Sequence, residues 1–129
     1  MSLPSRGEVW WVDLEPTQGD EQRSRKGPRP CLVISVDEHN SMTRSPLDTV
    51  LAAPLSSTIR SDIPWHIGFN AEELGMNKDG AVLCDQIRSL ARERFEEKEG
   101  EVHPDSPVMR LVLDRLMVLT GYYEADPVG

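Results

Sequence analysis

The chain has 129 residues, of which 38% are hydrophobic and 28% charged, and its formal net charge is −8. This length fits one domain, and a domain of this size buries enough surface to fold without disulfides or structural metals. No apolar run is longer than that from Leu116 to Leu119, so a membrane-spanning helix is not expected. Residues 1–6 lack the apolar stretch of a signal peptide, so we expect no secretory signal.

The two cysteines lie far apart in the sequence, and each is part of an apolar run. Neither Cys31 nor Cys84 belongs to a CxxC pair or to a cysteine–histidine cluster with zinc spacing. We expect two buried, reduced thiols in a cytoplasmic protein, with a disulfide as the less favoured alternative.

The negative charge is concentrated in the second half of the chain. Residues 1–60 contain seven basic and eight acidic side chains, whereas residues 61–129 contain seven basic and fourteen acidic ones. In the first half, Arg23, Arg25, Lys26 and Arg29 place four cations within seven residues. An acidic protein is normally a poor candidate for binding nucleic acid, but this segregation leaves a basic segment that could do so.

In chain order, the sequence predicts several short strands and then one helix. Residues 8–14 alternate, with Trp10, Val12 and Leu14 on one face. A long polar connection follows over residues 17–30, and connections of this length are often functional. Further strands are predicted at residues 31–36, 49–55 (stopped near Pro54), 65–69 and 81–87, with a loop over residues 37–48.

Residues 90–99 combine helical propensity with acidic side chains, and the pattern does not decide their element. The C-terminal element is clearer, because Ser106 is a good N-cap and Pro107 a good first helical residue. Apolar residues then recur at helical spacing as far as Leu119, with Gly121 just beyond. The predicted fold class is α+β, mainly β: a small barrel or sandwich with a C-terminal helix.

Several catalytic chemistries find little support. His39, His66 and His103 have no partner at metal-ligand spacing and no neighbouring nucleophile, so surface or edge positions are favoured for all three. The acidic run over residues 96–101 is better explained as a solvated face than as a cation site. The glycines form neither a P-loop nor a dinucleotide-binding motif. We therefore expect no metal and no cofactor.

What remains is the arginine-rich segment and a hydroxyl cluster at a strand end, Ser56, Ser57 and Thr58. Arginine stays protonated at any working pH and presents a fixed fork of donors to a phosphate. Together these groups could hold a phosphodiester and stabilise the charge that grows as it is cleaved. The same hydroxyl cluster is also an ordinary turn sequence.

An ordered set of motifs resembles the MazF/PemK family of toxins. The family's opening pattern is matched by Arg6–Trp10, Asp13–Pro16, Gly19–Gln22 and Arg29–Ser35. Later matches are Asn40 with Ser45–Pro46, the apolar strand Ala53–Ser57, the segment Leu83–Leu90 (LCDQIRSL), and Leu116–Tyr122 in the final helix. The motifs keep the family's order along almost the whole chain.

This resemblance implies an SH3-like β-barrel with a C-terminal helix, assembled as a homodimer. It also implies an endoribonuclease toxin of a type II toxin–antitoxin module. Members of the family cut single-stranded RNA, mostly mRNA, at short sequences without metal. The 2′-OH attacks the adjacent phosphate and leaves a 2′,3′-cyclic phosphate and a 5′-OH. The expected partner is a MazE-like antitoxin bound across the active-site cleft.

The family's catalytic arginine falls on Arg29 and its hydroxyl partner on Ser56. An arginine, whose pKa lies above about 12, suits charge stabilisation and proton donation better than proton abstraction, so the general base stays unassigned. Polar side chains can read the edges of splayed RNA bases, and basic ones can hold the backbone. The implied RNA-binding residues are Gln18, Glu21, Gln22, Arg25, Lys26, Ser57, Asp85 and Gln86.

Two features depart from the family pattern: the first loop is longer between Gln22 and Arg29, and serine replaces the commoner threonine at position 56. Serine keeps the hydroxyl but lacks the methyl group that restricts χ1. Two other functions stay open. A CcdB-like gyrase poison would need a C-terminal Trp-Gly-Ile, whereas this chain ends Asp126–Gly129. A catalytically silent SH3-like binding module would release no RNA fragments.

Overall fold

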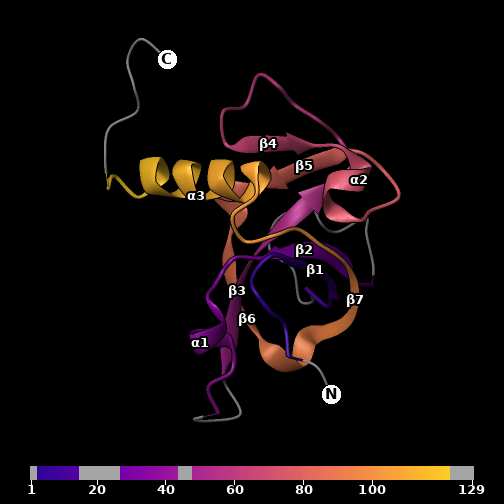
Figure 1. The fold of residues 1–129 in the computed structure, drawn as a ribbon, viewed down its shortest axis with the longest axis vertical. Helices are drawn as coiled ribbons and strands as arrows, with labels where there is room; N and C mark the ends of the chain where they lie inside the picture. The colour runs from indigo at the N-terminus through magenta and orange to yellow at the C-terminus, as the bar shows by residue number, and fades with distance from the viewer. Residues whose placement is uncertain (1–2, 15–26, 44–47, 123–129) are drawn as a thin grey trace.

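The computed structural model describes residues 3–14, 27–43 and 48–122 (Figure 1). It contains one antiparallel sheet with the strand order β4-β5-β3-β2-β1-β7, and β6 pairs with β3. The strands are β1 (Glu8–Val12), β2 (Arg29–Val33), β3 (Thr49–Ser56), β4 (His66–Phe69), β5 (Gly80–Leu83), β6 (Arg88–Ala91) and β7 (Phe95–Glu101). The helical elements are α1 (Asp37–Asn40), α2 (Ala71–Leu74), η2 (Cys84–Gln86), η3 (Arg92–Arg94) and α3 (Pro107–Leu119).

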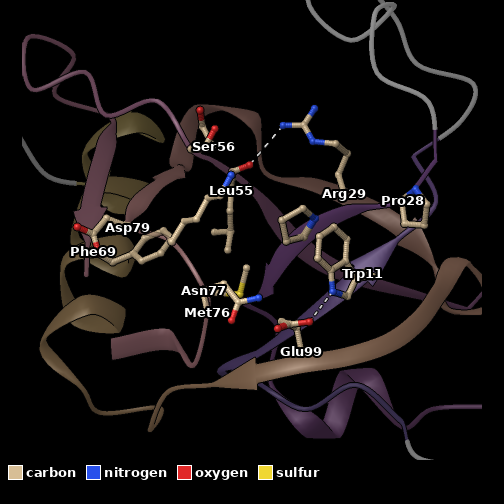
Figure 2. A pocket seen from close by; sticks show the side chains of 13 residues that line it. Trp11, Pro28, Arg29, Leu55, Ser56, Phe69, Met76, Asn77, Asp79 and Glu99 are labelled. Carbon is tan, nitrogen blue, oxygen red and sulfur yellow. Dashed lines mark hydrogen bonds between the residues drawn. The ribbon is translucent and has the colours of Figure 1, made fainter. Parts of the chain in front are cut away.

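The predicted fold class is confirmed: the sheet curls in the manner of a small barrel, and a C-terminal helix packs against it. The sheet is not a closed cylinder, because within the described part of the chain the end strands β4 and β7 do not pair with each other. The start of β2, the end of β3 and the middle of β7 meet around a pocket (Figure 2).

Period-two alternation divides the apolar side chains between two cores. On β1, Trp10 and Val12 enter one core, together with Leu14, and Val9 enters the other, as the sequence predicts. Trp10 is 6% exposed and packs edge-on against Phe95, with ring centroids 6.3 Å apart. The core that contains Val9 is covered by α3. No helix among the described residues is long and apolar enough to cross a bilayer.

The helix α3 begins as predicted. The hydroxyl oxygen of Ser106 accepts a hydrogen bond from the backbone N–H of Met109 at 3.3 Å, and Pro107 occupies the first turn. Val108, Met109 and Val112 are fully or almost fully buried against the sheet. Figure 1 shows α3 lying beside β4 and β5 at one end of the molecule.

Several predicted boundaries are wrong. The strand β1 ends at Val12 rather than residue 14, and β2 ends at Val33 rather than residue 36. The strand β2 starts at Arg29 rather than residue 31, because Arg29 and Pro30 already pair with β1. The strand β3 continues through Pro54 to Ser56. On one side of β3, residues 49–52 pair with β6 and residues 55–56 pair with β5, and Pro54 lies between these two pairings. The strand can therefore continue through Pro54, because no hydrogen bond of the sheet needs the N–H that proline lacks. The predicted strand at 81–87 is interrupted by η2 and resumes as β6.

Residues 90–99, which the sequence left undecided, are the end of β6, then η3, and most of β7. Tertiary pairing with β1 overrides their helical propensity, since β7 lies antiparallel to β1 from Glu8↔Glu101 to Val12↔Phe95. The loop expected over residues 37–48 contains the short helix α1, and α2 was not predicted at all.

A buried polar network explains why the second loop carries an asparagine. Asn40 is 1% exposed, and its Nδ2 donates to the backbone oxygen of Ser35 at 2.9 Å. The Ser35 hydroxyl in turn bonds to the Asn40 side-chain oxygen and accepts from the backbone N–H of Leu51 at 3.0 Å. Asn40 therefore fastens α1 to β3. Ser45–Pro46, the other matched motif here, lies outside the described residues.

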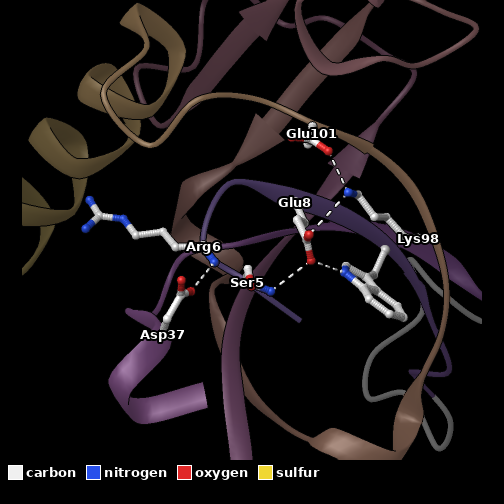
Figure 3. A network of polar contacts seen from close by, with 7 residues as sticks. Ser5, Arg6, Glu8, Asp37, Lys98 and Glu101 are labelled. Atoms are coloured by element: carbon white, nitrogen blue, oxygen red, sulfur yellow. Dashed lines mark hydrogen bonds and ion pairs between the residues drawn. The ribbon is translucent and has the colours of Figure 1, made fainter. Parts of the chain in front are cut away.

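Glu8 is the centre of a second network, which fixes the N-terminal segment (Figure 3). Its Oε1 accepts hydrogen bonds from the Ser5 backbone at 2.8 Å and from the Trp10 indole at 2.9 Å. The Nζ of Lys98 lies 3.2 Å from Oε2 of Glu8 and 2.5 Å from Oε1 of Glu101, so Lys98 forms ion pairs with two carboxylates on adjacent strands. Burial raises the pKa of Glu8, but the hydrogen bonds from Trp10, Ser5 and Lys98 outweigh it and hold that pKa below its usual value.

Both thiols are free and buried, as predicted. Burial raises the pKa of Cys31 and that of Cys84 to about 12 each, so both are neutral at physiological pH. These cysteines fill space in the two cores and are not nucleophiles.

Candidate active site

A pocket of about 300 Å³ lies where the start of β2 meets the end of β3. Arg29, Ser56 and Ser57, three of the residues that the sequence assigns to the site, are brought together in its wall. The remaining lining residues are Trp11, Pro28, Pro30, Leu55, Phe69, Met76, Asn77, Lys78, Asp79 and Glu99.

The sheet positions Arg29 in this pocket. As the first residue of β2, it pairs with Val12 of β1, and its guanidinium extends toward the end of β3 (Figure 2). Its Nη2 donates to the backbone oxygen of Leu55 at 3.3 Å. The guanidinium is therefore anchored to the carbonyl immediately before Ser56, next to the hydroxyl cluster.

Ser56 ends β3 at a close approach of two strands. It pairs with Ala81 of β5, and a Cβ added at the preceding residue, Gly80, would lie 2.3 Å from the backbone oxygen of Ser56. The Ser56 hydroxyl oxygen accepts a hydrogen bond from the backbone N–H of Thr58 at 3.0 Å. Because one lone pair of the hydroxyl is held by this turn, its O–H proton can be donated to a ligand.

Two carboxylates line the pocket, and each is engaged by a donor. Glu99 of β7 accepts from the indole N–H of Trp11 at 2.8 Å, and Asp79 accepts from the backbone N–H of Ala71 at 2.8 Å. Lys78 adds a second cation beside Arg29 in the lining. The pocket thus combines cationic and hydroxyl donors with an aromatic wall, a combination that suits a phosphodiester attached to a planar base.

Asp85 and Gln86 do not line this pocket. They lie in η2, beyond the end of β5, whereas the residue opposite Ser56 is Ala81 at the start of β5. Asp85 is exposed, and its Oδ1 lies 4.0 Å from Nε2 of His66. To contact Asp85 and Gln86, an RNA bound in the pocket would have to continue along the surface to η2.

The other implied RNA-binding residues, Gln18, Glu21, Gln22, Arg25 and Lys26, lie outside the described residues. Sequence reasoning missed Trp11, Lys78, Asp79 and Glu99. For Glu99 alternation gives no signal, because it groups Glu99 with buried Phe95 and exposed Glu97, and bulges shift the register between β7 and β1. The interpretation of this run as a solvated face is wrong at Glu99, which is partly buried against Trp11.

The chain is similar to known proteins along almost its whole length. The family model of PemK-like, MazF-like toxins of type II toxin–antitoxin systems matches residues 5–120. Endoribonuclease MazF9 of Mycobacterium tuberculosis is 35% identical over 98 residues, which cover 75% of this chain and 80% of that protein. Endoribonuclease EndoA of Bacillus subtilis is 30% identical over 116 residues, which cover 90% and 93%.

Solved structures agree with these matches. MazF from Deinococcus radiodurans is similar with a TM-score of 0.73 at 30% identity, over 94% of this chain and 99% of that one. A mycobacterial endoribonuclease in complex with its cognate antitoxin is similar with a TM-score of 0.71 at 25% identity, over 95% and 99%.

Proposed function

Because the chain belongs to the PemK-like, MazF-like family of type II toxin–antitoxin toxins and is an endoribonuclease, we propose that the Arg29 pocket is where it cuts RNA. The substrate is single-stranded RNA, chiefly mRNA, cut at a short sequence so that translation and growth stop. The CcdB-like and silent-module alternatives are not favoured, since the named relatives are endoribonucleases. The observation that carries the proposal is that Arg29 and Ser56 share one pocket wall.

In the proposed reaction, the 2′-oxygen of one nucleotide attacks the adjacent phosphorus, and the bond from phosphorus to the 5′-oxygen of the next nucleotide breaks. The products are a 2′,3′-cyclic phosphate and a 5′-OH. Negative charge builds on the non-bridging oxygens in the transition state. Arg29, anchored through Leu55, presents permanently protonated donors to that charge.

Ser56 supplies a neutral donor to the same phosphate. Its oxygen already accepts from Thr58, which orients the hydroxyl before substrate arrives. A donor fixed in advance needs little reorganisation as charge develops. No side chain is assigned as the base that removes the 2′-proton, and we propose that the reaction proceeds without a metal ion.

The assembly we propose is a homodimer. Tryptophans on both faces of one strand in so small a domain suggest that one of them packs outside the monomer core, but this supports a dimer only weakly, because Trp10 is buried within the monomer and Trp11 lines the pocket. Better support comes from α3, on which Leu111 is 45% exposed and Leu119 is 37% exposed, with Tyr122 just beyond at 78%. Leu111 and Leu119 are eight residues apart on α3, about 80° around the helix axis, so they share a side that a second copy could cover.

The proposed partner is a MazE-like antitoxin. A structurally similar mycobacterial endoribonuclease was solved with its cognate antitoxin. An extended acidic segment of the antitoxin would place carboxylates at Arg29 and so block the phosphate site. We place the complex in the cytoplasm, where mRNA is found and where buried thiols such as Cys31 stay reduced.

The test is digestion of an mRNA transcript by the purified protein, with fragment ends mapped by primer extension. Wild type should release discrete fragments, and Arg29→Ala should release far fewer. Arg110→Ala is the matched control, since it removes an exposed arginine on α3 that is absent from the pocket lining. Intact transcript after incubation with folded wild type would contradict the proposal.

A further inference from the structure

We propose that Trp11 is a stacking platform for one nucleobase of the bound RNA, and that Glu99 holds its ring in position beside the phosphate site at Arg29. The inference rests on the proposed function, because it concerns the same substrate in the same pocket. It assigns a role to two residues that lie outside the matched catalytic motif.

Trp11 lies outside the hydrophobic core. Adjacent residues of a strand point to opposite faces, so Trp10 is 6% exposed in the core whereas Trp11 is on the outer face and only partly buried. Trp11 belongs to neither buried cluster. A large aromatic ring that lines the pocket and takes no part in the core is available to a ligand.

On the side of β2, the residues that flank Trp11 are apolar and rigid. Pro30 is its cross-strand neighbour, and Pro28 also lines this side of the pocket (Figure 2). Prolines have no backbone N–H and no polar side-chain atom, so this wall offers the flat face of a base almost no hydrogen bonds. Stacking on an aromatic ring is what such a wall can provide, and it is available to every base.

Glu99 fixes the indole ring of Trp11 and also keeps the phosphate of a nucleotide away from it. Its Oε1 accepts from the indole N–H of Trp11 at 2.8 Å, which satisfies the only polar atom of that side chain. Its negative charge repels a phosphate from this wall, whereas Arg29 attracts one to the end of β3. The nucleotide is thereby oriented, with its base against Trp11 and its phosphate at Arg29.

The test combines protein variants with substrates that lack one base. The cleavage site of wild type is mapped first, and oligoribonucleotides with a single abasic residue at each position near that site are then compared in single-turnover cleavage. For wild type, one abasic position should weaken binding about 5- to 150-fold, the range that corresponds to the loss of one base–aromatic stack.

In Trp11→Leu, the loss of binding caused by an abasic residue at that position (the abasic penalty) should disappear, and abasic penalties at other positions should persist. Trp11→Phe should keep most of the penalty because a ring remains. Trp65→Leu is the matched control, since Trp65 is partly buried outside this pocket, and its profile should equal that of wild type. Glu99→Gln keeps an acceptor for the indole and should retain the penalty, whereas Glu99→Leu should reduce it.

If Trp11→Leu does not fold, the comparison between Glu99→Gln and Glu99→Leu tests the same coupling. An abasic profile that is identical in wild type and these variants would overturn the inference and leave the proposed function intact. Failure of folded wild type to cut any RNA would instead overturn the proposed function, and the platform with it.

Discussion

Removal of the Arg29 guanidinium should separate binding from catalysis. In Arg29→Ala, the anchor to the Leu55 oxygen at 3.3 Å is lost, together with the charged donors beside Ser56. The fold should tolerate the change, because Arg29 is at the start of β2 and its side chain is only partly buried. Lys78 remains in the pocket lining and still attracts the RNA backbone.

The size of the effect follows from the role of the donor. Loss of one preorganised donor to a charge that develops in the transition state costs about 2.7–4 kcal/mol, or about 100- to 1,000-fold in kcat. Loss of a cation that only contacts the backbone raises KM and reduces the salt dependence of binding, by less than about one unit of log–log slope on a single strand. Arg29→Ala should show the first pattern, and Lys78→Ala the second.

The assay is single-turnover cleavage of a fluorescent oligoribonucleotide at saturating protein across a salt series. Ser56→Ala should lower the cleavage rate of bound RNA, as Arg29→Ala does. Ser56→Thr should stay active because the hydroxyl is kept. Arg29→Lys should recover only part of the rate, since an ammonium group lacks the planar fork. If Arg29→Ala cleaves bound RNA at the wild-type rate, the reasoning about this residue is refuted.

Three further predictions concern stability and assembly. Asn40→Ala should lower the free energy of unfolding by roughly 2–4 kcal/mol in urea denaturation, because it leaves buried polar atoms of Ser35 unpaired. The control Asn70→Ala, at an exposed position, should lower it by only about 1 kcal/mol. Equal losses in the two variants would contradict the role assigned to Asn40. Glu8 has a lowered pKa in the folded state, so its contribution is present above the unfolded pKa and lost as pH falls through the folded one. Glu8→Gln should therefore flatten the acid limb of stability against pH, and an unchanged limb would count against this network. Leu111→Glu should shift the mass measured by light scattering from dimer to monomer, whereas a wild-type monomer at micromolar concentration would rule out the homodimer.

The sequence predicts the strand framework well because its signals are local. Alternation at Trp10 and Val12 and the cap at Ser106 depend on neighbours within a few residues, and the structure has them as predicted. Segment 90–99 could not be predicted, since its pairing partner β1 lies more than eighty residues away. The matched motifs assigned Arg29 and Ser56 to one site, and both residues line the pocket.

The rest of the pocket depends on long-range contacts that no short pattern records. Glu99 bonds to Trp11 across 88 residues of sequence. Asp79 lies in the pocket because it binds the start of α2, a helix of four residues that the sequence did not predict. The resemblance implied Asp85 as an RNA contact, but only the fold places it beyond the far end of β5, outside the pocket.

The most direct test of the central claim is the chemistry of the cut ends. An oligoribonucleotide that contains the mapped cleavage site is incubated with wild type in excess EDTA, and the products are weighed by mass spectrometry. A matched oligonucleotide carries one 2′-deoxy residue immediately 5′ of the scissile phosphate. The account predicts a 2′,3′-cyclic phosphate and a 5′-OH from the first substrate and no cut at that position in the second. Cleavage of the deoxy substrate there, or activity that vanishes in EDTA and returns with Mg²⁺, would contradict it.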